Sequence, residues 1–116
     1  MAKDFVKNKD LYEELVRCID ASIYSMELHG MFEKMVDKFG YNFTYLRSED
    51  RKDCSAFAMM DVYMYWRGFN PKYKNAFAYI TQIVKNGYAK GWRKLYPFGF
   101  EHSNMISTSH HDLYNL

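Results

Sequence analysis

Apolar residues at helical spacing constrain this chain more than any other feature of its sequence. Met31, Phe32, Met35, Val36 and Phe39 return every three to four residues, so they line one side of a helix. The chain of 116 residues holds only 2 prolines and 6 glycines, whereas 11 tyrosines and 9 phenylalanines supply amphipathic surface. This pattern favours helices over a turn-rich β fold. We therefore expect an all-α fold, a compact bundle of about four helices in a single domain.

Capping residues place the boundaries of the first two predicted helices. Asn8 or Asp10 can cap the first helix, and its apolar stripe continues through Leu28. The His29-Gly30 pair is predicted to break or kink the chain. A second helix is then expected over residues 31–39, with the glycine that follows as its C-cap.

Two further helices are predicted downstream. Ser48 is expected to start the third helix, which runs to about Arg67 and stops at Gly68. Asn75 can cap the fourth helix, which is expected to span residues 76–94. Each of these boundaries depends on residues within one turn of the helix end.

The end of the chain differs in composition from the helical region. Residues 1–97 are predicted to form the helical domain, and residues 98–116 a flexible tail that becomes apolar again over its closing string HHDLYNL. A polar tail with an apolar tip can serve as a short peptide ligand for a partner. It can equally dock on its own domain, and the sequence leaves both interpretations open.

The sequence carries no sign of a membrane, metal or catalytic site. No apolar run approaches the ~18 residues that span a bilayer, so a cytosolic protein is expected. Cys18 and Cys54 lie far apart and are predicted to be buried, reduced thiols. No catalytic motif occurs, and the 4 histidines lack metal-ligand spacing. We therefore expect neither an enzyme nor a bound cofactor or metal.

Positive charge is concentrated in one segment. Residues 71–95 carry six Lys or Arg and no acid, whereas residues 1–70 and 96–116 each sum to −2, within a net charge of +2. Basic residues interleaved with rings are typical of single-stranded nucleic acid binding, because cations follow the phosphates and rings stack on unpaired bases. A solvated basic helix whose rings face the core fits the same pattern. The basic residues are Lys72, Lys74, Lys85, Lys90, Arg93 and Lys94, and the rings include Tyr73, Tyr79 and Trp92.

One stretch of the chain resembles a known family. The residues concerned are Asp53, Ala58, the Phe69-Asn70 pair, the string KYKNAFAYITQ at 72–82, and Asn86. They resemble region 2 of bacterial sigma factors, and most closely the late-transcription sigma factors of T-even-type phages. The resemblance covers residues 5–95 and is strongest over residues 69–86.

The resemblance implies a polymerase-binding helix. In sigma region 2, the helix that corresponds to residues 50–67 docks on the clamp helices of the largest subunit of core RNA polymerase. The apolar members of the contact set can instead face the core of their own domain, and that alternative stays open. The implied contact residues are Asp53, Phe57, Met60, Asp61 and Met64.

The turn and helix that follow are implied to bind promoter DNA at a −10-like element. Gln82, Lys85 and Asn86 share a helix face by their spacing and can reach base edges or phosphates. The tryptophan pair with which primary sigma factors melt DNA falls at Ile80 and Thr81, so this chain lacks that device. The implied DNA-binding residues are Lys72, Tyr73, Lys74, Tyr79, Thr81, Gln82, Lys85, Asn86, Lys90, Trp92, Arg93 and Lys94.

Late factors of this type also tether to the DNA sliding clamp through a short hydrophobic C-terminal peptide. The string DLYNL at 112–116 resembles such a peptide, with Leu113, Tyr114 and Leu116 as its anchors. The resemblance thus implies a phage-encoded sigma factor, monomeric when free, in the cytoplasm of the infected bacterial host. The alternative is a sigma-like adaptor or inhibitor that occupies the polymerase clamp without promoter recognition.

Overall fold

The computed structural model describes residues 6–97 of the chain, and this part is built from helices alone. A one-turn 3₁₀ helix, Gly40–Asn42, follows the second α-helix, and another, Trp66–Gly68, follows the third. No strand occurs among the described residues, so the predicted all-α fold is confirmed. The four α-helices of this part are α1 (Asn8–Ala21), α2 (Met26–Phe39), α3 (Ser48–Tyr65) and α4 (Ala76–Leu95).

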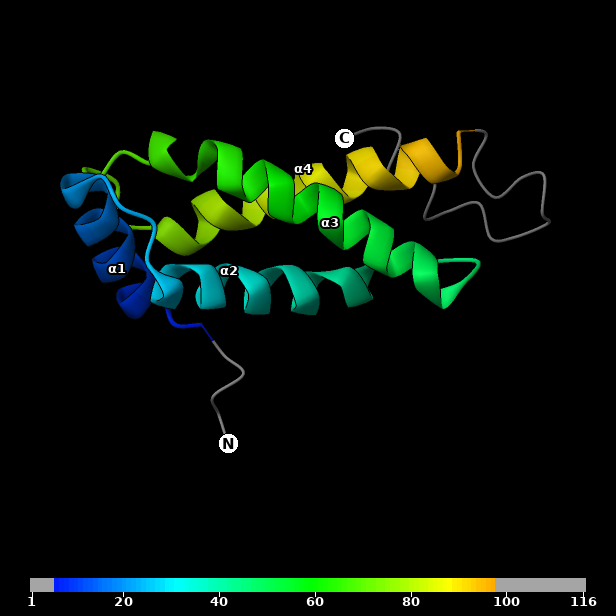
Figure 1. The fold of residues 1–116 in the computed structure, drawn as a ribbon, viewed down its shortest axis with the longest axis horizontal. Helices are drawn as coiled ribbons and strands as arrows, with labels where there is room; N and C mark the ends of the chain where they lie inside the picture. The colour runs from blue at the N-terminus through cyan, green and yellow to red at the C-terminus, as the bar shows by residue number, and fades with distance from the viewer. Residues whose placement is uncertain (1–5, 98–116) are drawn as a thin grey trace.

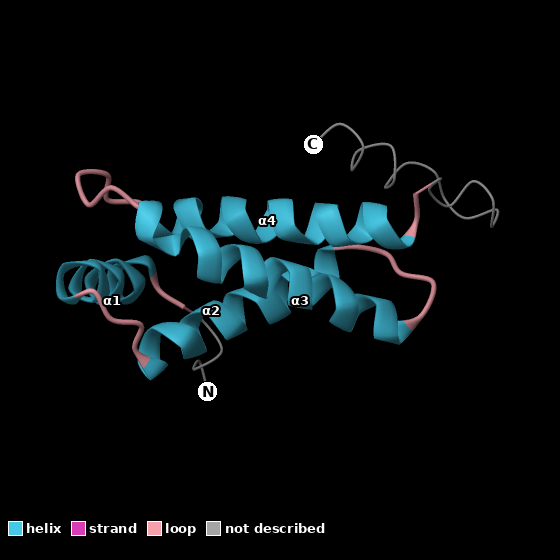
Figure 2. Cartoon of the chain, turned by 45° about the horizontal axis from the view of Figure 1, so that its top comes forward, coloured by secondary structure: helices cyan, strands magenta, loops and turns pink. Residues whose placement is uncertain are grey.

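Helices α2, α3 and α4 run along the molecule, and α1 lies across one end. Figure 1 shows α2, α3 and α4 side by side along the long axis, with α1 set crosswise against them. Helices α3 and α4 make the most extensive contact of any pair, and they stay adjacent when the molecule is turned (Figure 2). All four helices bury apolar side chains in one core, which includes Leu11, Leu15, Leu28, Phe32, Val62, Trp66, Ile80, Val84, Tyr88 and Trp92.

The backbones of α3 and α4 meet because α4 carries two glycines at the contact. A Cβ atom added to Gly87 would lie 2.5 Å from the Cα of Ala58, and one added to Gly91 would lie 3.1 Å from the Cα of Cys54. At both positions only a residue without a side chain leaves room for this close approach. Cys54 and Cys18 are free and buried, as predicted.

The connection between α1 and α2 differs from the prediction. The first helix ends at Ala21, and Ser22 adopts the left-handed conformation at φ 57°. Ser25 then caps α2 by accepting the Leu28 N–H at 3.0 Å, and its hydroxyl donates to the buried Glu14 of α1. His29-Gly30 therefore lies inside α2 and makes neither a break nor a kink.

Asn8 caps a different helix from the one expected. Helix α1 begins at this residue without a side-chain cap. The Asn8 side chain instead accepts the Phe77 N–H at 2.9 Å and donates to the Lys74 carbonyl at 3.1 Å. Asn75 caps α4 as predicted, by accepting the Ala78 N–H at 3.0 Å. Two asparagines thus satisfy the first free N–H groups of α4.

The C-terminal half of α4 and the residue that follows it form hydrogen bonds with α2 and with the connection after α2. Trp92 Nε1 donates to the Thr44 carbonyl at 3.0 Å, and the Tyr88 hydroxyl donates to the Val36 carbonyl at 2.8 Å. The Tyr96 hydroxyl accepts the Leu46 N–H at 3.0 Å. Burial raises the pKa of Tyr88 and of Tyr96 to about 12, so both remain hydroxyl donors.

Candidate partner-binding faces of α3 and α4

One side of α3 faces outward and carries four of the residues predicted to contact polymerase. Asp53, Phe57, Met60 and Met64 follow one another at helical spacing, so they lie in line along the helix. Met60 and Met64 are 57% and 56% exposed, Asp53 is exposed and Phe57 is half-buried. The side of α3 that bears Ala58 packs on α4, and the ring of Phe57 lies at the edge of that contact, against Gly91. The two methionines therefore do not belong to the core.

Tyr63 extends this outward surface, and the sequence-based prediction did not include it. Its side chain is 60% exposed, and its ring meets the ring of Tyr24 edge-on at 5.2 Å. Its position three residues after Met60 is the signal that marks it. Clustered exposed apolar groups indicate a partner surface. We refer to Phe57, Met60, Tyr63 and Met64 as the α3 patch.

Asp61, the remaining predicted polymerase contact, lies on the inner side of α3. Its side chain is buried, and its Oδ2 forms an ion pair with Lys90 Nζ at 2.9 Å. Lys90 was predicted to bind DNA, so two predicted partner contacts instead bind each other. A buried carboxylate requires such a cation, because an unpaired buried charge is costly. The pair joins α3 to α4.

The three rings predicted to stack on bases are placed in different surroundings. Trp92 is fully buried, so its ring cannot stack on a base while α4 stays in the bundle. Tyr79 is half-buried; its hydroxyl donates to the Tyr65 carbonyl at 2.9 Å, and burial raises its pKa. Tyr73 is 64% exposed in the turn before α4. Of the three, Tyr73 alone presents an open ring.

The polar residues of α4 do share a face, as their spacing predicted. Gln82 and Asn86 are exposed, and Gln82 Nε2 donates to Asn86 Oδ1 at 3.0 Å. Lys85 and Thr81 lie beside them and are half-buried. A partner that reads the amides of this face must therefore exchange or extend the bond between Gln82 and Asn86.

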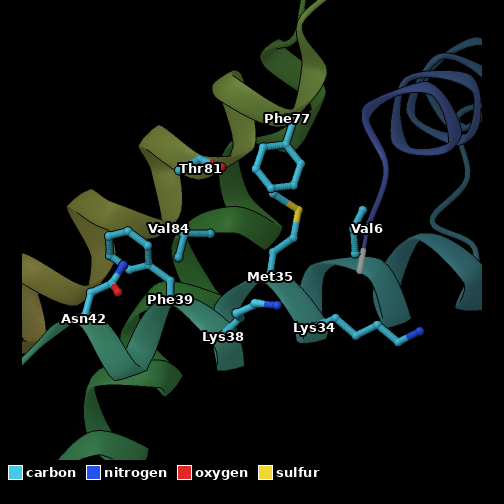
Figure 3. A pocket seen from close by; sticks show the side chains of 9 residues that line it. All are labelled: Val6, Lys34, Met35, Lys38, Phe39, Asn42, Phe77, Thr81 and Val84. Atoms are coloured by element: carbon cyan, nitrogen blue, oxygen red, sulfur yellow. The ribbon is translucent and has the colours of Figure 1, made fainter. Parts of the chain in front are cut away.

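A groove runs along this face between α2 and the first turns of α4. It holds a cavity of about 340 Å³, and Figure 3 shows side chains from both helices converging on it. A second hollow continues the groove past Thr81 to Gln82 and Lys85. The walls are mostly apolar, and we call the whole the α2–α4 groove. Its first cavity is lined by Val6, Lys34, Met35, Lys38, Phe39, Asn42, Phe77, Thr81 and Val84.

Sequence reasoning missed the α2 side of this groove. Lys34 and Lys38 lie one helical turn apart on α2 and bring positive charge to the groove opposite the basic stretch. The absence of acids marks residues 71–95 as basic. Lys34 and Lys38 carry no such mark, because Glu33 and Asp37 directly precede them and cancel their charge in the sequence. Their four-residue spacing is the local signal that could have found them.

The basic residues of the predicted DNA site are spread over the length of α4. Lys72 and Lys74 are exposed before its start, and the Lys74 ammonium lies 5.3 Å from the centre of the Tyr12 ring. Arg93 and Lys94 lie in its last turn, half-buried and exposed respectively. Helix α4 spans about 30 Å at 1.5 Å per residue. The cations thus form a line rather than one patch.

Other predictions concern sites that the described residues do not contain. Leu113, Tyr114 and Leu116 lie outside residues 6–97. Within that range, no group of three or more His, Cys, Asp or Glu is arranged to hold a metal ion, and no helix is long and apolar enough to cross a membrane.

The sequence matches no protein-family model, and neither a curated protein nor a solved structure is significantly similar to it.

Proposed function

We propose that this chain is a small phage-encoded sigma factor that binds host core RNA polymerase and directs it to a late-promoter −10-like element. The observation that carries the proposal is the outward side of α3. Four residues that the sigma resemblance assigned to polymerase contact, Asp53, Phe57, Met60 and Met64, lie in line there. A carboxylate beside exposed methionines suits a partner that offers arginines and an apolar surface.

The promoter-binding part of the proposal rests on α4 and the turn before it. Gln82 and Asn86 offer amides for adenine edges, and Lys85 offers a cation for phosphate. Lys72, Lys74 and Tyr73 lie exposed at the start of the helix, where they meet backbone and an unpaired base. Trp92, Lys90 and Asp61 are not part of this surface.

The tail supplies the third contact in this proposal. Leu113, Tyr114 and Leu116 anchor the chain to the DNA sliding clamp, which holds the polymerase complex near the promoter. The chain performs no chemistry and needs no cofactor, because the polymerase supplies catalysis. It works as a monomer in the cytoplasm of the infected bacterial host.

The alternative is an adaptor or inhibitor that occupies the polymerase clamp without reading DNA. The burial of Trp92 and the Lys90–Asp61 ion pair favour it, because Trp92 is then closed to DNA and the Lys90 ammonium is already bound to a carboxylate. Such an adaptor needs the α3 patch but not the amide pair of Gln82 and Asn86. Substitution of both amides by alanine therefore separates the two functions.

The first test is capture of bacterial core RNA polymerase by the purified chain. We expect wild type to retain polymerase and Asp53→Arg to lose it, because a like charge then faces the arginines of the clamp helices. Glu13→Arg is the matched control, since Glu13 is an exposed acid on α1, and it should retain polymerase. No capture by wild type with polymerases from several hosts would refute both the sigma and the adaptor function.

The second test concerns the tail. We expect Leu113→Ala combined with Tyr114→Ala to abolish clamp-stimulated transcription and to leave basal binding of polymerase unchanged. Transcription is measured on a promoter template with and without the loaded clamp. Equal loss in both assays would show that these residues do not serve the clamp.

A further inference from the structure

The α2–α4 groove has the chemistry of a site for a short segment that is both acidic and apolar. A cavity of about 340 Å³ takes bulky apolar side chains, and nearby cations attract a carboxylate. Apolar groups form its floor and lysines line its edges. The floor is made by Met35, Phe39, Phe77 and Val84, and the lysines are Lys34, Lys38 and Lys85.

Residues 98–116 of the same chain have the complementary composition. They contain two acids, Glu101 and Asp112, and no Lys or Arg. Asp112 directly precedes the apolar residues Leu113 and Tyr114. One carboxylate beside two bulky apolar groups matches a hollow with an apolar floor and a basic edge.

The segment is also long enough to reach the groove. Helix α4 ends at Leu95, and Phe77 stands in the groove about 27 Å back along the helix at 1.5 Å per residue. The chain from Pro97 to Leu113 extends to about 53 Å at 3.3 Å per residue. A link of this length holds its end near the groove at an effective concentration on the order of millimolar.

We propose that, in the free protein, residues 112–116 dock in the α2–α4 groove of their own domain. Leu113 and Tyr114 lie on the apolar floor, and the Asp112 carboxylate faces the lysines. The docked segment covers Thr81 and Lys85, which line the groove. If the proposed function holds, a partner that captures the same apolar anchors uncovers these two residues for DNA.

A spin label on the tail tests the docking in the full chain without polymerase, clamp or DNA. Ser109→Cys provides a reactive thiol close to the docking residues. Cys18 and Cys54 are fully buried, and burial raises the pKa of Cys54 to about 12, so neither native thiol takes the label. We expect the paramagnetic label to broaden the amide NMR signals of Asn42 and Thr81 beyond detection. The amide signal of Met60 on α3 should keep its intensity.

Two variants with a matched control identify the contacts. Leu113→Ala with Tyr114→Ala should restore the erased groove signals and alters only residues outside the helical domain. Lys34→Glu with Lys38→Glu should restore them too, because the groove edge then repels Asp112. Lys52→Glu, at an exposed position on α3, should leave them erased.

Three outcomes would overturn the docking. Groove signals could keep their intensity in the labelled wild type. Their loss could depend on protein concentration, which would place the tail on a second copy. Their loss could survive the Leu113 and Tyr114 substitutions. Each result is independent of polymerase capture, so failure here leaves the proposed function standing.

Discussion

At the scale of single residues, buried polar side chains of this protein form hydrogen bonds and ion pairs with groups on neighbouring helices. Glu14 is the clearest case: it accepts from Arg17 Nη2 at 2.6 Å and Nε at 3.1 Å, from the Ser25 hydroxyl, and from the Cys18 thiol at 3.5 Å. The Arg17 bonds lower the pKa of Glu14 to about 2, against burial, which raises it, and with help from Ser25 and Cys18. One carboxylate thus ties α1 to the cap of α2.

The lowered pKa of Glu14 predicts that the protein loses stability in acid. The folded pKa of about 2 lies below the ordinary value of 4.5, so its stabilisation is present above pH 4.5 and is lost as the pH falls toward 2. We expect Glu14→Gln to lower the free energy of unfolding by about 1–3 kcal/mol at neutral pH. The variant should also weaken the decline of that free energy in the acidic window.

Urea denaturation at a series of pH values measures this effect. Trp66 and Trp92 are both buried and report unfolding by fluorescence. Glu13→Gln, on the exposed neighbour of Glu14, should keep the wild-type pH profile. An unchanged profile in Glu14→Gln would show that the cluster does not depend on the charge.

At the scale of elements, the contact between α3 and α4 depends on the absence of side chains. Gly87 lies against the backbone of Ala58, and Gly91 lies against Cys54 and the ring of Phe57. Glycine weakens a helix by about 0.8–1.0 kcal/mol relative to alanine. The protein accepts that cost twice in α4 because packing of the two backbones outweighs it.

Alanine substitutions should therefore have opposite effects in α4 and α2. We expect Gly87→Ala to lower the free energy of unfolding by about 1–3 kcal/mol, because its Cβ would lie 2.5 Å from the Ala58 Cα. Gly30→Ala should raise it by about 0.8–1.0 kcal/mol, because no atom lies within 4 Å of that added Cβ in α2. Urea midpoints measure both. Equal stabilisation by the two substitutions would mean that the helices part easily.

At the scale of the whole molecule, the surfaces proposed for polymerase and DNA lie on different helices. The α3 patch follows the outward side of α3, whereas Lys85 lies with Gln82 on the groove side of α4. One domain can therefore bind both partners together. The candidate phosphate-binding cations lie on α4 and in the turn before it, whereas Asp53 lies on α3.

A change at Lys85 should reach DNA alone. We expect Lys85→Ala to reduce the slope of log affinity against log salt by about 0.7–0.9, the value for one lost phosphate contact. Promoter DNA binding by core polymerase with a chain that carries Leu113→Ala and Tyr114→Ala, so that the tail cannot cover Lys85, is titrated over salt concentration and measures the slope. Lys52→Ala, at an exposed position on α3, should leave it unchanged. An unchanged slope in Lys85→Ala would mean that Lys85 touches no phosphate.

The sequence predicted those features that depend on neighbouring residues. The span of α4 and its Asn75 cap follow from local signals, and so does the line of Met60 and Met64 on α3. The break before α2 was misplaced, because it depends on Ser25 meeting Glu14 on another helix. Contacts between distant residues were likewise beyond the sequence.

Burial was the hardest property of the candidate site to predict. Spacing alone placed Trp92 on α4 but could not tell that Thr44 would accept its N–H from the connection after α2. Asp61 and Lys90 sit on separate helices, so their ion pair needs the bundle to form first. The α2–α4 groove needs two helices for the same reason.

The glycine contact between α3 and α4 also gives the molecule a fixed internal geometry. Because the two backbones touch at Gly87 and Gly91, close packing there opposes rotation of one helix against the other. If the proposed polymerase contact on α3 holds, the direction of α4 relative to that partner is set by this helix contact. A larger residue at Gly87 would change the angle between the α3 patch and the polar face of α4. It would leave the residues of both surfaces as they are.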